Sequence, residues 1–155
     1  MEAYLSLFPF LVAVFGAALT GAFFMPGEWY KSLKKPGWTP PDWLFAPAWS
    51  VLYIAIAVAG WLVWQNEGWG TALIVWSANM VFNAAWSWLM FGRRQIGIAL
   101  FDALAMLLTI IAFVALTRST TPVAAMLFLP YLAWVAFASV LNYSIFTMNH
   151  GRSSN

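Results

Sequence analysis

The sequence predicts an all-α membrane protein, a bundle of five transmembrane helices with an ordered first loop. Hydrophobic residues make up 63% of the 155 residues and charged residues only 8%, whereas a soluble domain has about 25% charged residues. The apolar residues gather into five runs, each near the length of about 20 residues that crosses a bilayer. The chain length suits one domain, so we expect a single transmembrane domain over residues 1–155.

Short connectors separate most of the predicted helices, which cover residues 4–25, 43–65, 70–91, 96–117 and 122–148. A polar turn, a basic turn and a turn that ends in proline join the last four. The first loop, residues 26–42, is longer and contains Pro36, Pro40 and Pro41. Proline fixes its own φ and biases the preceding residue toward extended conformations, so we expect an ordered loop that lies over the bundle.

The positive charges lie mostly at one end of the predicted bundle. Six of the seven lysines and arginines belong to the first loop, the third turn and the C-terminal tail: Lys31, Lys34, Lys35, Arg93, Arg94 and Arg152. Positive residues favour the cytoplasmic side, so we expect the first loop and the C-terminus in the cytoplasm of a bacterium, with the inner membrane favoured. The lipid bilayer is the expected environment, and a net charge of +2 gives no reason to expect nucleic acid.

The residue inventory excludes several kinds of chemistry. The chain has no cysteine, and its single histidine, His150, lies five residues from the end of the sequence. Disulfides and thiolate sites are therefore excluded, and we expect no metal site and no histidine ligand for a haem iron inside the bundle. We also find no catalytic triad and no carboxylate pair, so we expect no catalytic residues.

Aromatic and amide side chains form stripes on three of the predicted helices. Trp49 and Tyr53 are four residues apart and share a helix face. An amide in hydrocarbon is costly unless it is paired, so the asparagines should face the interior. Either they link the helices, or the stripes line a cavity for a flat apolar ligand. The other stripes are Asn79, Phe82, Asn83 and Trp86, and Tyr131, Trp134, Ala138, Leu141, Asn142 and Ile145.

Asp102 is the one acidic residue well inside a predicted span. A carboxylate at that depth should be paired or protonated. Arg93, Arg94 and Gln95 come one to two turns earlier, so we expect a structural pair with one of them or with an indole N–H. The alternative is a proton relay, for which the sequence offers no second buried acid or histidine.

Four stretches of the sequence resemble one known family. The stretch EWYKSLKKPGWTPPDWLF looks like the first loop of the TspO/MBR family, which includes tryptophan-rich sensory proteins, translocator proteins and peripheral-type benzodiazepine receptors. NMVFNAAW and FGRRQIGIALFD resemble its third and fourth helices, and LPYLAWVAFASVLNYSIF resembles its fifth. The resemblance covers nearly the whole chain, in order.

The resemblance implies a ligand site between the helices under the first loop. Members of the family bind porphyrins such as protoporphyrin IX and haem, as well as sterols and isoquinoline-carboxamides, and they are usually homodimers. The porphyrin is a ligand, and no cofactor is required. The family's cholesterol motif is incomplete here, because the first cation after Tyr143 is Arg152. Motif positions, with Tyr53 added for the face that it shares with Trp49, give the candidate site Tyr30, Trp38, Trp49, Tyr53, Asn83, Trp86, Trp134, Ala138 and Leu141.

The expected function is therefore that of a membrane receptor, sensor or carrier for tetrapyrroles and related flat hydrophobic ligands, which contributes to tetrapyrrole regulation or transport. Two alternatives stay open. One is light-dependent porphyrin degradation without a cofactor, in which the porphyrin supplies the excited state and nearby indoles are oxidised. The other is a structural or interaction protein that has no ligand.

Overall fold

The computed structural model describes residues 2–150, and that range contains helices and no strand. The predicted all-α fold is therefore confirmed. In chain order the elements are α1 (Glu2–Leu5), α2 (Phe8–Phe23), α3 (Glu28–Ser32), α4 (Asp42–Glu67), α5 (Thr71–Ser87), the π-helix η1 (Trp88–Gly92), α6 (Ile96–Thr117) and α7 (Pro122–Asn149).

Three helices, α4, α6 and α7, are long and apolar enough to cross a membrane. The apolar helix α2 is shorter, with 16 residues, and α5 has 17 residues that include Asn79 and Asn83. Together with their hydrophobic composition, these helices make the chain an integral membrane protein. The total of five spans stays a prediction.

The prediction of one continuous helix over residues 4–25 is wrong. The chain turns at Ser6 and Leu7, between α1 and α2. The cause is Pro9, which lies in the first turn of α2. Within a longer helix its ring would clash with the carbonyl of Leu5, four residues earlier, so the helix stops and starts again.

The predicted helix 70–91 changes its winding in the last turn. The Arg93 N–H donates to the Trp88 carbonyl at 2.7 Å, which is the five-residue spacing of a π-helix. Arg94 then takes a left-handed φ of 56° and redirects the chain into α6. The predicted helix 96–117 agrees with α6 at both ends, and the second and last predicted helices differ from α4 and α7 by one or two residues.

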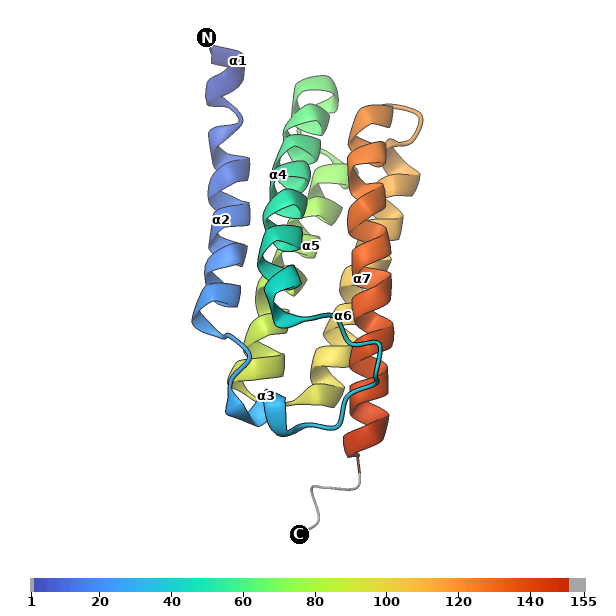
Figure 1. The fold of residues 1–155 in the computed structure, drawn as a ribbon. Helices are drawn as coiled ribbons and strands as arrows, with labels where there is room; N and C mark the ends of the chain where they lie inside the picture. Colours follow the sequence, from blue (N-terminus) through green and yellow to red (C-terminus); the bar gives the residue numbers. More distant parts are fainter. Residues whose placement is uncertain (1, 151–155) are drawn as a thin grey trace.

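The helices run side by side along the length of the molecule (Figure 1). In that view α2 lies beside α4, while α7 lies on the other side of the bundle with α6 close to it. Packing is closest where α6 meets α7 and α5, and α2 packs on α4 and α5. The interior is continuous and apolar, and Ile56, Phe113, Phe128 and Tyr131 are fully buried in it.

The first loop is ordered and lies across one end of the bundle, called here the loop end (Figure 1). Asn149 at the end of α7 accepts a hydrogen bond from the Lys34 backbone N–H (3.0 Å) and donates one to the Lys34 carbonyl (2.9 Å). Lys35 Nζ donates to the Tyr30 carbonyl at 2.7 Å, at the end of α3. The two Asn149 bonds attach the loop to the last helix, and the Lys35 bond ties the loop to α3.

Candidate ligand-binding site

Four aromatic rings from α4 and α7 meet in the interior near the loop end. Trp49 stacks on Tyr53, with ring centroids 5.4 Å apart. The same indole makes edge contacts with Tyr131 at 6.2 Å and with Trp134 at 6.4 Å. Since all four belong to the predicted stripes, the helical spacing located this cluster correctly.

A chain of hydrogen bonds crosses the bundle beside these rings. Tyr53 Oη donates to Asn83 Oδ1 at 2.9 Å, and Asn83 Nδ2 donates to Tyr131 Oη at 2.8 Å. Tyr131 Oη then donates to Asn79 Oδ1 at 3.0 Å, and Asn79 Nδ2 donates to Thr109 Oγ1 at 2.8 Å. The asparagines of α5 thus link α4, α6 and α7, which was one of the two roles left open by the sequence.

A second polar link lies nearer the loop end. Trp86 Nε1 donates to Asn142 Oδ1 at 3.2 Å, and Asn142 Nδ2 donates to the Ile96 carbonyl at 3.1 Å. The Trp86 ring also makes an edge contact with Phe91 of η1 at 5.5 Å. This link connects α5, α7 and the first residue of α6.

The loop contributes Tyr30 and Trp38. Tyr30 is buried and makes an edge contact with Phe91 at 5.4 Å. Burial, with a smaller contribution from the charge of Asp42, raises the pKa of Tyr30 to about 12, so its hydroxyl stays neutral at physiological pH. Trp38 is 49% exposed and has its ring edge against Phe137 of α7 at 5.6 Å.

The remaining predicted residues, Ala138 and Leu141, lie on α7 one and two turns after Trp134. Leu141 is buried in the same apolar cluster as Tyr30, whereas Ala138 is half-buried. The nine predicted site residues therefore come from α3, the loop, α4, α5 and α7 and lie in or beneath the loop. Their role in binding a ligand stays a prediction.

Sequence reasoning missed three phenylalanines that contact the predicted site residues. Phe45 makes an edge contact with Trp134 at 5.7 Å, while Phe91 and Phe137 contact the loop residues described above. Phe45 lies four residues before Trp49, so helical spacing could have found it. Phe91 lies in the π-helix, whose changed winding has no simple sequence signal.

The expected pairing of Asp102 is not seen. Asp102 is only 9% exposed, and its Oδ2 atom has no hydrogen-bond partner. The guanidinium of Arg93 lies over the Trp88 ring, and that of Arg94 lies over the Trp29 ring. The left-handed residue Arg94 and the π-turn before it direct both arginines toward aromatic rings and not back along α6.

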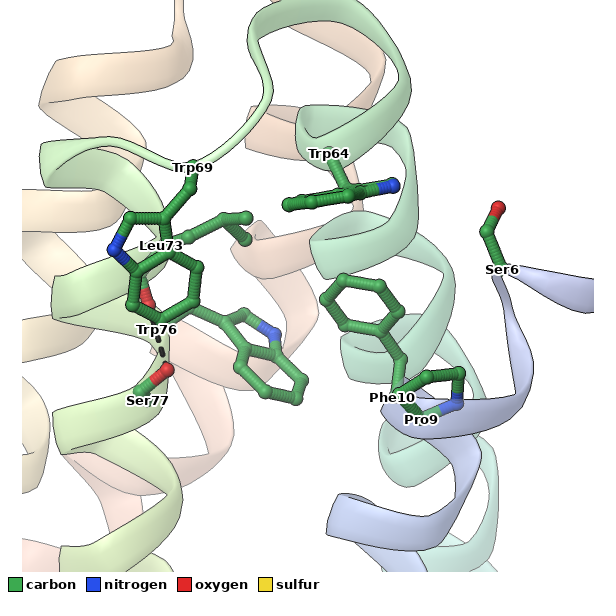
Figure 2. Close-up of a pocket in the computed structure, with 8 residues that line it drawn as sticks. All are labelled: Ser6, Pro9, Phe10, Trp64, Trp69, Leu73, Trp76 and Ser77. Carbon is green, nitrogen blue, oxygen red and sulfur yellow. Dashed lines mark hydrogen bonds between the residues drawn. The ribbon is translucent and has the colours of Figure 1, made fainter. Parts of the chain in front are cut away.

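Two cavities lie outside these nine residues. One, of about 310 Å³, lies between α2, α4 and α5 at the end of the bundle opposite the loop, and Figure 2 shows the residues that line it. The other, of about 300 Å³, lies at the loop end between the start of α6 and the end of α7. The first is lined by Ser6, Pro9, Phe10, Trp64, Trp69, Leu73, Trp76 and Ser77, and the second by Arg94, Gln95, Ile96, Gly97, Phe146, Asn149 and His150.

Gly60 allows two of the rings that line the first cavity to pack closely on α4. The Phe10 ring makes an edge contact with Trp76 at 5.2 Å, and Figure 2 shows the two rings facing each other between the helices. A Cβ atom at Gly60 would lie 2.7 Å from Trp76 and 2.8 Å from Phe10. A glycine at this position therefore lets both rings pack directly on the backbone of α4, where Trp76 Nε1 donates to the Ile56 carbonyl at 3.0 Å.

The fold and this interior define the class of the protein: a helical integral membrane protein whose core is built from aromatic rings and bridging asparagines. A sequence profile of the TspO/MBR family matches residues 6–148. The chain therefore belongs to the TspO/MBR family.

Named relatives extend over most of the chain. It is 38% identical to the tryptophan-rich sensory protein of Cereibacter sphaeroides over 143 residues, which is 92% of this chain and 90% of that protein. It is 39% identical to the human translocator protein over 139 residues (84% and 82%). It is also 36% identical to protein CrtK of Rhodobacter capsulatus over 146 residues (92% and 91%).

Proposed function

We propose that this protein is a membrane receptor, sensor or carrier that binds tetrapyrroles, such as protoporphyrin IX and haem, and related flat hydrophobic ligands. Membership of a family with tryptophan-rich sensory proteins and translocator proteins supports a membrane sensor or receptor role. The observation that carries the ligand assignment is the meeting of Trp49, Tyr53 and Trp134 beneath the ordered loop. The ligand occupies the region between α4, α5 and α7, which α6 borders where it packs on α5 and α7.

The chemistry of these side chains suits a porphyrin. Its macrocycle is a large flat π-system, and each aromatic contact adds about 0.5–1.5 kcal/mol beyond the buried area. The propionates lie toward the lysines of the loop. Lys31 pairs with Glu28 at 2.9 Å, and Lys35 donates to the Tyr30 carbonyl. Lys34 is exposed beside Asn149 and is the lysine that we assign to a propionate.

The same proposal includes the arrangement in the membrane. The chain crosses the membrane five times, with α2 and the combined α5 and η1 as the shorter spans. The loop end, which contains Lys31, Lys34, Lys35, Arg93 and Arg94, faces the cytoplasm of a bacterial inner membrane. The functional unit is a homodimer, as the family resemblance implies.

Tryptophan fluorescence tests the ligand assignment. Titration of iron-free protoporphyrin IX into the detergent-solubilised protein is expected to give saturable quenching, because the porphyrin lies against indoles. The double variant Trp49→Ala and Trp134→Ala should bind at least about tenfold more weakly, since two aromatic contacts are lost. The matched control is Trp43→Ala with Trp69→Ala, whose indoles are 73% and 65% exposed. Equal affinities for the two double variants would contradict the assignment.

A second candidate function is photochemical degradation of the bound porphyrin. It is favoured by the direct contact of three oxidisable rings, Trp49, Tyr53 and Trp134, at the proposed site. Illumination of the complex in air should then produce a bilin-like absorbance. Bleaching at the rate seen for porphyrin in detergent alone would reject this activity.

A purely structural role is the remaining alternative, and the inter-helix bonds of the asparagines support it. It predicts that porphyrin leaves the melting temperature unchanged. A ligand that binds the folded state must raise apparent stability, so a thermal shift on addition of protoporphyrin would exclude this alternative.

A further inference from the structure

Two buried polar atoms stand out from the satisfied interior. Among the residues that the structure describes, the buried side-chain atoms without a hydrogen-bond partner are Asp102 Oδ2 and Trp134 Nε1. Burying an unpaired polar group is costly, and most such groups in native proteins have a partner. One atom can accept a hydrogen bond and the other can only donate. The pair therefore points to a missing molecule of complementary polarity.

Asp102 lies between the two polar links of the bundle. Toward the loop end, Ile96 of α6 is bonded to Asn142. Toward the centre, the Met106 carbonyl accepts from Asn79 at 3.3 Å. Asp102 lies between these two residues of α6, and it shares the buried face of the helix with Met106. Its carboxyl group is thus directed to the interior at the depth of the aromatic cluster.

Trp134 borders the same interior from α7. Its ring contacts Trp49, and Trp49 contacts Tyr131. Asn83 Nδ2, which donates to the Tyr131 hydroxyl at 2.8 Å, also contacts Met106 Sδ at 3.9 Å, one turn after Asp102 on the same buried face of α6. Asp102 and Trp134 therefore border the same group of side chains, which is the group assigned above to the ligand.

We infer that Asp102 is the polar anchor of this site, where Oδ2 accepts a hydrogen bond from an N–H or O–H of the ligand while Trp134 Nε1 donates to an acceptor on it. The inference rests on the proposed ligand-binding function and narrows it. The site selects planar apolar molecules that carry both a donor and an acceptor. A planar hydrocarbon or a molecule that has acceptors alone leaves the carboxyl group unpaired.

The first test compares the stability of two variants without ligand. Asp102→Ala removes a group that has no partner, so the melting temperature should stay the same or rise. The matched control Asn142→Ala removes a similar side chain nearby in the bundle, but it leaves the Trp86 N–H without its partner and breaks the bond to the Ile96 carbonyl, so its melting temperature should fall. A fall in Asp102→Ala as large as that in Asn142→Ala would overturn the inference, because the carboxyl group would then hold helices together.

The second test measures selectivity. Protoporphyrin IX has N–H and O–H donors, whereas palladium(II) protoporphyrin dimethyl ester has none and its square-planar metal takes no axial ligand. The measured quantity is the affinity for protoporphyrin IX divided by the affinity for the palladium ester. This ratio is compared between the wild type and Asp102→Ala. Contributions from the loop lysines occur in both proteins and cancel in this comparison.

The expected result is a ratio at least about tenfold smaller in Asp102→Ala, because a hydrogen bond to a charged or buried carboxyl group is lost. Asp102→Asn keeps an acceptor oxygen and should restore part of the ratio. Trp134→Phe keeps an aromatic ring but loses the indole N–H. It should weaken the binding of both probes, because both have carbonyl acceptors.

Two results would overturn this inference and leave the proposed function intact. They are an unchanged ratio in Asp102→Ala, or tighter binding of protoporphyrin IX by that variant. The second would mean that the carboxylate repels the propionates. If the wild type shows no saturable binding of either probe, the proposed function fails and the inference fails with it. The outcomes thus separate the two claims.

Discussion

Tyr131 belongs both to the chain of hydrogen bonds and to the aromatic cluster. Its side chain is fully buried, and its hydroxyl accepts from Asn83 and donates to Asn79. Its ring contacts Phe128 at 5.4 Å as well as Trp49. One side chain of α7 thereby fixes the position of α5 and the orientation of the indole on α4. The arrangement of the aromatic cluster thus depends on the two hydrogen bonds of the Tyr131 hydroxyl group.

Tyr131→Phe should therefore destabilise the protein although the ring is kept. The loss of the hydroxyl group leaves one amide donor and one amide acceptor without this partner, at a cost of about 1–3 kcal/mol. The change is measured as a fall in thermal midpoint in detergent. Tyr143→Phe is the control, because Tyr143 is 57% exposed. Equal midpoints for the two variants would show that the hydrogen-bond chain contributes nothing.

The loop and α7 are the elements that enclose the candidate site. Asn149 pairs with both backbone groups of Lys34, as a neighbouring strand would. The buried Tyr30 packs α3 against Phe91 of the bundle, and Lys35 bonds to the Tyr30 carbonyl within the loop. The hydrogen bonds that attach the loop backbone to α7 thus come from a single amide side chain at the end of that helix.

Asn149→Ala should release the loop without unfolding the bundle. The Lys34 N–H loses its partner, and we expect backbone hydrogen exchange over residues 33–39 to become about tenfold faster. Thr147→Ala is a suitable comparison, because the Thr147 hydroxyl bonds within α7 to the Ser144 carbonyl at 3.0 Å. Unchanged exchange in the Asn149 variant would mean that other contacts hold the loop.

The packing of α2 on α4 and α5 depends on Gly60. An alanine there would place its Cβ 2.7 Å from Trp76 and 2.8 Å from Phe10. We expect Gly60→Ala to destabilise the protein by about 1–3 kcal/mol through overpacking. Gly16→Ala, where no atom lies within 4 Å of the added Cβ, should be neutral or slightly stabilising. A thermal midpoint that rises in both variants would contradict this packing.

For the whole molecule, much of the architecture could be predicted because it depends on local patterns. The apolar run between Gln95 and Arg118 gave α6 correctly at both ends. The break before α2 was not predicted, because the apolar run continues through it and hydropathy does not register the clash of Pro9 with the carbonyl four residues earlier. The stripe spacing placed the aromatic and amide residues together, since a helix repeats its faces every three to four residues.

The partners of individual polar groups were harder to predict. Asp102 was expected to pair with a nearby arginine, but the π-turn and the left-handed Arg94 direct both arginines elsewhere. Such pairings depend on the conformation of the turn between two helices, which composition and periodicity do not encode. Phe91 escaped the prediction for the same reason, because its contacts depend on the winding of η1.

A structure of the protein with iron-free protoporphyrin IX, determined in a lipid environment, tests the central claim most directly. The account predicts the macrocycle between α4, α5 and α7, in contact with Trp49 and Trp134 and beneath the loop that Asn149 holds. A macrocycle in the groove beside Phe10 and Trp76, or on the lipid-facing surface, would contradict it.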